Sequence, residues 1–362
     1  MVKILSVNRQ GLGDIAKRRD VFNYLRSLKY NIYCLQDTHF TSDIENYVRN
    51  LWGFQCYFSS FASNSRGVAI LINNNFDFKS ISMKGDIDGN YLLLKMCIDS
   101  HEVILCNIYG PNIDSPQFFE NIQSHVDDMQ CQNIIWCGDF NLVLNTSLDC
   151  YNYKCISNPK ARDKVLELIE SYGYVDPFRQ LHENLRRYSW RKKSPLKQSR
   201  LDFFLLSESL LSSLDTCYIE SSYRSDHSPI SLSLTFNDFK KGRGLWKFNN
   251  SLLYDKEYLE CIRDVILNVK KQYAVPVYNM DNIHNIPDEN IFLTINDQLF
   301  LETLLFEIRG KSISYSSYIK KKKNKEEQDL IKEITAMEEN ASEGNIDDLF
   351  EKKTRVRKTK KT

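Results

Sequence analysis

Polar side chains that can do chemistry recur in this chain where short apolar runs end. Asn8 follows KILSV, Asp37 follows IYCLQ, and Asp139 and Asn141 follow NIIWC in the stretch IIWCGDFN. Loops at strand ends are held by a rigid sheet, and functional residues gather in such loops. The other members of this set are Tyr109 in VILCNIY, Asp202 in SRLDFF, and Asp226 and His227 in YRSDHSP. We expect the whole set to converge on one site.

The residue types in this set suit a hard divalent cation and a phosphate ester. Grouped carboxylates repel one another unless a cation lies among them. Oxygen ligands without cysteine or paired histidines favour Mg²⁺ or Mn²⁺ over zinc. With histidine and asparagine nearby, such an ion can neutralise phosphate oxygens while a carboxylate orients the attacking water. The sequence has no Walker lysine or glycine-rich phosphate cradle, which disfavours nucleotide-driven phosphoryl transfer.

Each member of the set also has a simpler explanation. A single aspartate after a strand is more often a helix N-cap or a turn former than a catalytic group. SDHSP is likewise compatible with a plain turn. The prediction of a site therefore rests on the set as a whole. Other histidines are expected to be surface or core residues, namely His101, His125, His182 and His284.

Short apolar runs between residues 1 and about 236 predict strands. They are rich in β-branched and aromatic residues and are bounded by Gly, Asn, Asp or Ser. The runs are KILSV (3–7), IYCLQ (32–36), GVAILI (67–72), YLLLKMCI (91–98), VILCNIY (103–109), NIIWC (133–137) and LDFFLL (201–206). SPISLSLTF (228–236) alternates, with Ile230, Leu232, Leu234 and Phe236 on one face, which predicts a strand covered on one side.

Amphipathic stretches lie between these runs and predict helices. They are DVFNYLRSL, SPQFFENIQSHV and ARDKVLELIESYG, the last of which ends in a glycine. Many strands with interspersed helices indicate a layered α/β domain.

The chain changes character after Phe236. GRGLWKFNN (242–250) has the glycines of a linker, and the segment after it is polar and helical in pattern. Five lysines fall within Lys320–Lys325, and the chain ends in KKTRVRKTKKT. These basic runs are compatible with nucleic-acid binding, with nuclear import, or with keeping a helix soluble. DLIKEITAMEE favours a solvated helix over a coiled-coil segment, and the end of the basic tail is expected to be disordered.

Composition is that of a globular protein. The 362 residues are 42% hydrophobic and 26% charged with a net charge of +1, so charge alone indicates no polyanionic partner. The ten cysteines include no C-x-x-C pair, and several lie in apolar runs, as reduced buried thiols do. The N-terminus is too short and polar for a signal peptide, and no stretch approaches the ~18 apolar residues of a membrane helix. We expect an intracellular, soluble protein.

Six motifs together resemble the endonuclease/exonuclease/phosphatase superfamily. In order from residue 7 to residue 230 they are VNRQGL, LQDTH, NIYGPN, CGDFN, SRLDFF and SDHSPI. The resemblance implies two stacked β-sheets flanked by helices, a layered β-sandwich of the α/β class. Within it, the chain looks most like the apurinic-type endonuclease of LINE-type (non-LTR) retrotransposons, because QDTH, NIYGPN and GVAILI are typical of that branch.

The same resemblance implies a division into two parts. Residues 1–236 would form the endonuclease domain, and residues 237–362 a linker with a helical, basic C-terminal extension. GRGLWKFNN resembles the segment that joins endonuclease to reverse transcriptase in those polyproteins. The polymerase motif Tyr-x-Asp-Asp is absent from this sequence. A retrotransposon fragment, a truncated gene model and a domesticated domain are all compatible with that.

Roles at the metal follow from the resemblance. Asn8 and Asp37 would hold Mg²⁺, or alternatively Mn²⁺, with Asp226 close by. Asp139 would orient and activate the attacking water.

Roles at the phosphate follow in the same way. Tyr109, Asn141 and His227 would contact the scissile phosphate and stabilise its developing charge. Asp202 would fix the tautomer of His227 through a hydrogen bond.

Asp37 departs from the family, whose Q-x-T-H motif normally carries glutamate. Losing one methylene retracts the carboxylate by roughly a bond length, and a misplacement of ~1 Å can cost ~10²-fold in rate. A bridging water can span such a gap, since Mg²⁺ retains several waters. We expect weakened but real activity, with loss of the metal site as the alternative.

Basic and aromatic residues cluster in RRYSWRKK, just before SRLDFF. A loop of this kind can lie along a phosphate backbone and probe groove width, and the alternative is a solvated hairpin with a structural tryptophan. Ser189 matches a position where the family often places Thr or Ser near the DNA backbone. The residues expected to contact DNA are Arg187, Ser189, Trp190, Lys192 and Lys193.

The resemblance implies a Mg²⁺-dependent endonuclease that nicks one DNA strand and leaves a 3′-hydroxyl, as for target-primed reverse transcription. One alternative is a phosphatase or phosphodiesterase of the same fold that acts on small or lipid phosphate esters. Another is a catalytically weakened, domesticated nucleic-acid-binding domain. The expected partner is double-stranded DNA, with RNA as a further partner for the basic tail and no membrane. The expected location is the nucleus.

Overall fold

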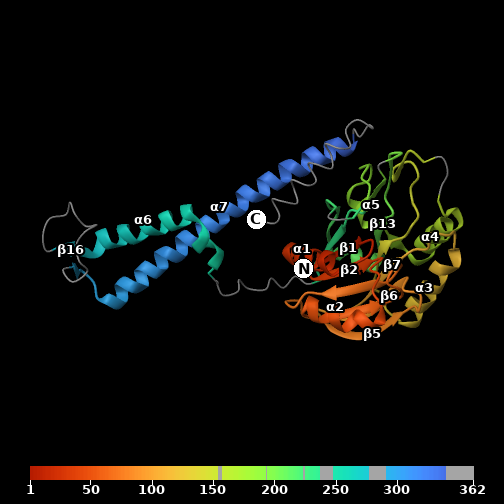
Figure 1. The fold of residues 1–362 in the computed structure, drawn as a ribbon, viewed down its shortest axis with the longest axis horizontal. Coiled ribbons are helices and arrows are strands. Elements are labelled where there is room, and N and C mark those ends of the chain that lie inside the picture. Colours follow the sequence, from red (N-terminus) through yellow and green to blue (C-terminus); the bar gives the residue numbers. More distant parts are fainter. Residues whose placement is uncertain (154–156, 193, 223–224, 237–247, 277–290, 340–362) are drawn as a thin grey trace. The chain divides into compact units, whose positions relative to one another are not determined.

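A computed structural model of the chain describes residues 1–153, 157–192, 194–222, 225–236, 248–276 and 291–339 (Figure 1). The chain divides into two compact units, of which the first comprises residues 1–240 and 331–362 and the second residues 241–330. Residues 237–247 lie outside the described residues, so the boundary expected after residue 236 and most of the GRGLWKFNN linker stay predictions.

The first unit contains two six-stranded sheets. One has the strand order β14-β15-β1-β2-β4-β3, in which β1 is parallel to β2 and antiparallel to β15. All residues of β2 and β4 are buried, as expected of runs that are apolar on both faces. The bounds are β1 (Val2–Asn8), β2 (Ile32–Gln36), β3 (Cys56–Ser59), β4 (Val68–Ile72), β14 (Leu214–Ile219) and β15 (Ile230–Leu234).

The other sheet has the order β10-β13-β8-β7-β6-β5. Its centre pairs β7 with β8 in parallel, and β13 joins β8 antiparallel. The strand β5 forms one edge, and every residue of it is exposed. The bounds are β5 (Lys79–Gly85), β6 (Tyr91–Ile98), β7 (His101–Tyr109), β8 (Ile134–Asp139), β10 (Tyr174–Val175) and β13 (Asp202–Ser207).

The sheets pack face to face, and helices cover their outer faces. Ile70 and Leu94, one from each sheet, belong to the same buried core cluster. Phe22 of α1 packs with Leu5 against the first sheet, and Phe119 of α3 packs with residues of the second. This confirms the predicted layered β-sandwich flanked by helices. The helices are α1 (Ile15–Leu28), α2 (Glu45–Trp52), α3 (Pro116–Asp128), α4 (Pro159–Tyr172) and α5 (Pro177–Leu181), with 3₁₀ turns η1 (Ser42–Ile44) and η2 (Glu208–Ser213).

Strand register brings several polar residues to the same end of the sandwich. Asn8 lies opposite Gln36 at the end of the parallel pair β1 and β2. Tyr109 lies opposite Asp139 at the end of the parallel pair β7 and β8, and Asp139 also lies opposite Asp202 of β13. Because the ends of parallel strands meet at one edge of a sheet, residues far apart in the chain become neighbours.

Two glycines allow the close approach of β7 and β8 at that edge. Gly138 has a φ of +139°, and a Cβ added there would lie 2.0 Å from the carbonyl oxygen of Ile108. A Cβ on Gly110 would lie 2.3 Å from the carbonyl oxygen of Phe140. Only glycine fits such contacts, which explains why the apolar run in IIWCGDFN breaks at a glycine directly before Asp139.

A third, small sheet contains three residues of the RRYSWRKK stretch, Trp190–Lys192. Its order is β11-β12-β9, with β11 (Trp190–Lys192), β12 (Lys197–Ser199) and β9 (Cys150–Tyr151). Trp190–Lys192 therefore form the first strand of a hairpin, paired antiparallel with β12. An isolated antiparallel bridge joins Trp190 to His227, so this hairpin is tied to the loop before β15.

The second unit is mainly helical, as predicted. Tyr258 and Tyr315 are buried in its small core, where the Tyr258 hydroxyl lies 2.7 Å from the Ser312 hydroxyl. The five lysines of Lys320–Lys325 are exposed on α7, and DLIKEITAMEE is part of the same helix. The basic tail after residue 339 lies outside the described residues. The elements are η3 (Asn250–Tyr254), α6 (Lys256–Tyr273), β16 (Ala274–Pro276), β17 (Ile291–Leu293) and the part of α7 (Asp297–Glu339) up to residue 330.

No helix in the described part of the chain combines the length and the apolar character needed to cross a membrane.

The strand at 230–234 corrects one expectation. It was predicted to be covered on one side only, yet Ser231 and Ser233 are buried along with Ile230 and Leu232. The small serines allow the second face to be covered, and the Ser231 hydroxyl donates to the Glu220 carboxylate at 2.9 Å. Alternation of serine with apolar residues thus marks a strand buried on both faces here.

Candidate active site

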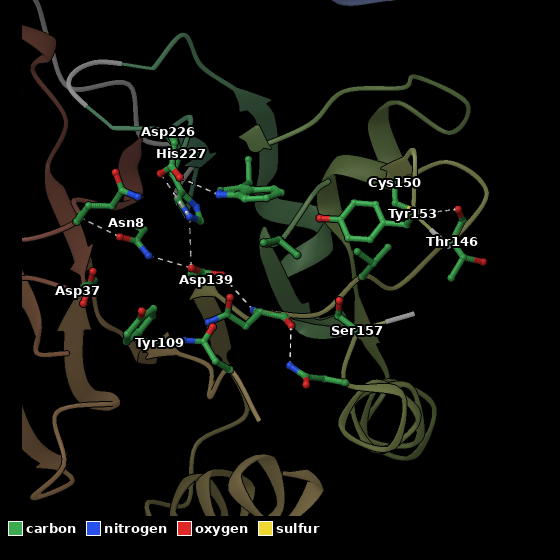
Figure 2. Close-up of a pocket in the computed structure, with 17 residues that line it drawn as sticks. Asn8, Asp37, Tyr109, Asp139, Thr146, Cys150, Tyr153, Ser157, Asp226 and His227 are labelled. Carbon is green, nitrogen blue, oxygen red and sulfur yellow. Dashed lines mark hydrogen bonds and ion pairs between the residues drawn. The ribbon is translucent and has the colours of Figure 1, made fainter. Parts of the chain in front are cut away.

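A cavity of about 470 Å³ opens at the edge where the strand ends meet (Figure 2). Its size is that of a small-ligand pocket, which spans roughly 300–1,000 Å³ in proteins. Eight of the residues singled out in the sequence line it, namely Asn8, Asp37, Tyr109, Asp139, Asn141, Trp190, Asp226 and His227. The structure therefore brings together side chains that lie more than 200 positions apart in the chain.

Asp139 lies at the centre of these residues and is buried. Its Oδ2 accepts a hydrogen bond from the Asn8 side-chain amide at 2.9 Å, and its Oδ1 accepts one from the backbone N–H of Asn141 at 3.0 Å. Burial raises the pKa of Asp139 to about 7, with a further contribution from the charge of Asp202, while His227 opposes the rise. A cation bound nearby would lower this pKa again.

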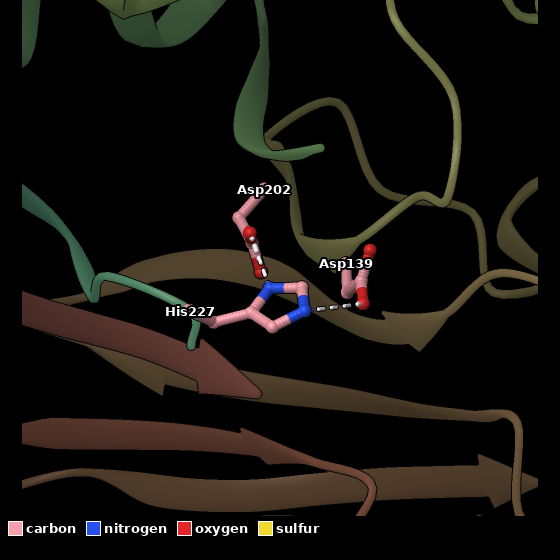
Figure 3. A group of neighbouring side chains, drawn as sticks. All are labelled: Asp139, Asp202 and His227. Atoms are coloured by element: carbon pink, nitrogen blue, oxygen red, sulfur yellow. Dashed lines mark hydrogen bonds and ion pairs between the residues drawn. The ribbon is translucent and has the colours of Figure 1, made fainter. Parts of the chain in front are cut away.

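His227 lies between two carboxylates (Figure 3). Its Nδ1 is 2.8 Å from Asp202 Oδ2, and its Nε2 is 3.7 Å from Asp139 Oδ2. Burial alone would lower the pKa of His227, but Asp202 and Asp139 outweigh it and raise that pKa to about 10. At neutral pH both ring nitrogens therefore carry a proton, and the Nε2–H points toward Asp139.

Asp37 is held through one of its two oxygens. Oδ1 is 3.1 Å from His39 Nε2 and accepts a hydrogen bond from the backbone N–H of Arg66 at 3.0 Å. No hydrogen bond to Oδ2 is found among the described residues. Asp37 and His39 have φ values of +49° and +57°. A non-glycine residue in that region costs on the order of 1–3 kcal/mol, and such strain collects at functional sites.

Asp226 is also held through one oxygen. The indole N–H of Trp190 donates to its Oδ2 at 2.9 Å. Its Oδ1 is buried and has no hydrogen-bond partner in the described part of the chain, with His227 Nε2 at 3.9 Å. The loop itself is tied to β1, because the Ser225 hydroxyl donates to the Asn8 carbonyl at 2.9 Å.

Open oxygens on the Asp37 side of the pocket fit a hard cation. Asp37 Oδ2 and Asp226 Oδ1 are both left without a donor, and Asn8 Oδ1 accepts only the backbone N–H of Gln10, at 3.0 Å, among the described residues. An unpaired buried carboxylate oxygen is costly, and a cation removes that cost. Oxygen-only ligands suit Mg²⁺ or Mn²⁺.

A second group of ligating atoms is better explained without a metal. One atom each from Asp139, Asp202 and His227 lies within 4.8 Å of the others. The imidazole bridges the two carboxylates, and its protonated nitrogens face them. A protonated ring nitrogen has no lone pair for an ion, so this group is better described as a charge cluster in which His227 is hydrogen-bonded to Asp202 and ion-paired with Asp139.

Neutral donors complete the pocket. Burial raises the pKa of Tyr109, and the charges of Asp37 and Asp139 raise it further, so the phenol keeps its proton. Asn141 has a φ of +52°, and its side-chain amide donates to the Gly110 carbonyl at 2.6 Å. Asn158 in turn donates to the Asn141 carbonyl at 2.9 Å. The turn after β8 is therefore fixed on both sides.

A buried ion cluster supports the wall beside Thr146 and Cys150. The Arg200 guanidinium bonds both oxygens of Asp149, at 2.8 and 2.9 Å, and also Asp176 at 2.6 Å. Burial opposes ionisation of Asp149, but Arg200 and Arg179 outweigh it and lower its pKa.

Two of the residues expected to contact DNA lie in the interior, which corrects that part of the prediction. Ser189 is fully buried, and its hydroxyl accepts the backbone N–H groups of Leu201 and Asp202 at 3.0 and 2.9 Å. Arg187 is also buried. Tyr188, between them, is buried as well, so the segment just before β11 runs through the interior. Ser189 supports the start of β13, which carries Asp202.

The other three residues of that prediction have different positions. Lys192 is exposed, and Trp190 lines the pocket with its N–H on Asp226. Lys193 lies outside the described residues. Contact of Lys192 and Trp190 with DNA stays a prediction.

Sequence reasoning missed a polar network between the two sheets directly beneath the pocket. The Gln36 side-chain amide donates to Asn107 Oδ1 at 2.6 Å and to the Ser6 hydroxyl at 2.9 Å. The Asn107 amide donates to the carbonyls of Leu35 and Ala69. All these side chains are buried, so the network fixes one sheet against the other. The sequence did contain a signal for this network, namely an amide side chain within each of two apolar runs, IYCLQ and VILCNIY.

No family model matches the chain, but relatives are found by sequence. It is 26% identical over 272 residues to the Transposon TX1 uncharacterized 149 kDa protein of Xenopus laevis, covering 73% of this chain and 20% of that protein. It is 25% identical over 258 residues to the exodeoxyribonuclease of Bacillus subtilis, covering 64% of this chain and 98% of that protein. The chain thus spans about a fifth of the length of the transposon protein.

Solved structures share the fold. The AP endonuclease LMAP from Leishmania major has a TM-score of 0.55 at 20% identity, covering 65% of this chain and 88% of that one. The APE2 catalytic domain from Xenopus laevis has a TM-score of 0.55 at 18% identity, covering 64% and 91%. The 3′ phosphatase NExo from Neisseria, bound to a product DNA hairpin, has a TM-score of 0.53 at 19% identity, covering 65% and 100%.

Fold, motif order and relatives agree on the class of protein. The chain shares its fold with AP endonucleases and a 3′ phosphatase and is similar in sequence to an exodeoxyribonuclease, which supports the superfamily resemblance that its motifs predicted. The match to a transposon protein supports the predicted resemblance to sequences of LINE-type retrotransposons.

Proposed function

We propose that this chain is a divalent-metal-dependent DNA endonuclease that nicks one strand by hydrolysis and leaves a 3′-hydroxyl, as target-primed reverse transcription requires. The observation that carries the proposal is the convergence of Asp37, Asp139, Asp226 and His227 on one pocket. Open carboxylate oxygens line one side of the pocket, and on the other side His227 is hydrogen-bonded to Asp202 and ion-paired with Asp139.

Asn8, Asp37 and Asp226 would hold the metal. When bound, Mg²⁺ or Mn²⁺ supplies neutralisation of charge at the phosphate oxygens and at the departing oxygen. Asp139 orients the water and accepts its proton as the new oxygen–phosphorus bond forms. The bond from phosphorus to the 3′ oxygen breaks, and that oxygen leaves with the electron pair and takes a proton from solvent. The products are a 5′-phosphate and a 3′-hydroxyl.

Positive charge and neutral donors act on the phosphate. His227 is protonated because two carboxylates face it, so its Nε2–H donates to a phosphate oxygen. Tyr109 and Asn141 add neutral donors from the ends of β7 and β8. Asp202 acts through His227, whose orientation and charge it holds.

Duplex DNA is the partner that we propose, with Lys192 as an exposed contact near the pocket. Binding of RNA by the basic tail and location in the nucleus belong to the same proposal, and rest on the lysine-rich runs at 320–325 and 352–361.

The test is relaxation of supercoiled plasmid with Mg²⁺ and after removal of metal by a chelator. We expect nicked circles only with metal. Asp139→Asn is expected to slow nicking by ~10²–10⁴-fold because the proton acceptor is lost. His227→Ala is expected to slow it by ~10²–10³-fold because a donor to the phosphate is lost. Asp128→Asn and His125→Ala, on α3, are matched controls that should nick at the wild-type rate.

Other outcomes would support other functions. Nicking that survives both substitutions, or that needs no metal, contradicts the proposed mechanism. Release of phosphate from small phosphate esters faster than plasmid nicking would support a phosphatase of the same fold. DNA binding without nicking would support a domesticated binding domain.

A further inference from the structure

We propose that His39 is a positioning residue for the metal site: it holds one oxygen of Asp37 and so turns the other toward the pocket. His39 Nε2 lies 3.1 Å from Asp37 Oδ1, which also accepts the Arg66 backbone N–H at 3.0 Å. Two donors on the same oxygen leave Oδ2 as the atom available to a cation. This inference rests on the proposed function and names a residue that the motif comparison did not assign.

The backbone around Asp37 fixes this arrangement. The loop is bonded on one side to the segment after β1, since Gly11 N–H donates to the Asp37 carbonyl at 2.8 Å. It is bonded on the other side to the Arg66 loop, since His39 N–H donates to the Arg66 carbonyl at 2.8 Å. The left-handed conformations of Asp37 and His39 fold this segment back, which lets side chains two positions apart meet.

The imidazole is also fixed on its far side. A Cβ added to Gly11, whose φ is +79°, would lie 2.6 Å from His39 Nδ1. The ring therefore lies between the Gly11 backbone and the Asp37 carboxylate, and its side chain is about 21% exposed. Such a confined ring has little freedom to release Oδ1.

This arrangement bears on the short side chain at position 37. An aspartate has one methylene less than the glutamate normal for the family motif, so its carboxylate reaches less far and depends more on orientation. A hydrogen bond from a neighbouring side chain that orients a metal ligand is commonly worth ~10–100-fold in metal affinity. We infer that His39 makes the shorter ligand usable by fixing which oxygen faces the ion.

The test is Mn²⁺ binding to the full chain without DNA, followed by electron paramagnetic resonance of the free ion. Asp37→Ala defines the part of the binding that belongs to this site. His39→Ala and His39→Phe remove the donor, and the second keeps a ring against Gly11. Both are expected to weaken the Asp37-dependent binding by ~10–100-fold. His39→Gln, which keeps an N–H with similar reach, should retain most of it, and His125→Ala should not change it.

Several results would overturn the proposal. Wild-type affinity in a folded His39→Ala or His39→Phe chain is one, and equal losses in His39→Gln and His39→Phe are another, because the hydrogen bond would then not matter. If His39→Ala fails to fold, His39→Phe and His39→Gln decide. A wild-type chain without Asp37-dependent Mn²⁺ binding also overturns it. A chain that binds Mn²⁺ as expected but never nicks plasmid contradicts the proposed function and leaves the role of His39 standing.

Discussion

Two carboxylates in the pocket are oriented by the ring N–H of a neighbouring side chain. Asp37 is held by His39, Asp226 by Trp190, and in both cases a ring N–H takes one carboxylate oxygen. A carboxylate with one oxygen paired and the other open is preorganised for a cation, because little rotamer freedom is lost on binding.

Trp190→Phe tests this view at Asp226. The substitution keeps an aromatic ring in the pocket wall and removes the N–H that bonds Oδ2, so Asp226 gains freedom to rotate. We expect nicking to require roughly tenfold more Mg²⁺, with DNA affinity unchanged, as measured by plasmid relaxation over a Mg²⁺ series and by fluorescence anisotropy on a duplex. A loss of DNA affinity with an unchanged Mg²⁺ requirement would instead support the DNA-contact role predicted from the sequence.

The sequence predicted which residues share the pocket but not how each one is held. Residue types at strand ends indicate chemistry, and eight of the chosen side chains do line one cavity. Ser189 and Arg187 were misplaced because the number of basic residues in RRYSWRKK does not reveal which side chains face inward. His39 was overlooked because its contact with Asp37 depends on left-handed backbone that no motif spacing reveals.

Two pairs of parallel strands position the site, β1 with β2 and β7 with β8. Apolar runs long enough to be buried on both faces predicted these central strands well. The strands β3, β5 and β14 were not predicted. Every residue of β5 is exposed, including Ile81 and Met83. Its sequence therefore lacks the continuous apolar run that predicts a buried strand. Edge strands are specified by pairing with a neighbour, which a local pattern does not contain.

Gly138→Ala tests the close approach of β7 and β8. The new methyl group would lie 2.0 Å from the Ile108 carbonyl oxygen in a backbone with a φ of +139°, so the strands must separate. We expect a loss of at least ~3 kcal/mol in the free energy of unfolding, measured by chemical denaturation. Gly13→Ala is the matched control, since its nearest neighbour would be the Ser63 carbonyl oxygen at 3.7 Å. Equal stabilities for the two variants would contradict this account of IIWCGDFN.

At the scale of the whole molecule, every residue that lines the pocket falls between Asn8 and His227. The core clusters of the first unit likewise contain no buried member beyond residue 234 among the described residues. Site and core thus belong to the same stretch of chain, while α6 and α7 have a small core of their own around Tyr258. Charge differs as well, because the exposed lysines at 320–325 lie on α7.

A chain cut after residue 236 is therefore expected to fold and to nick by itself. It keeps both sheets, the helices that cover them and all the lining residues, so it should unfold in one cooperative transition.

At saturating DNA it should nick plasmid with the same metal requirement and rate as the full chain. At low DNA concentration it should bind less well and depend less on salt, because the lysines at 320–325 and in the tail are lost. DNA-binding isotherms at several salt concentrations are compared for the fragment and for a full chain with those lysines changed to glutamine. The comparison separates the effect of the lost charge from any effect of truncation on folding. An aggregated fragment, or a folded one that no longer nicks at saturating DNA, would show that the C-terminal extension is part of the enzyme.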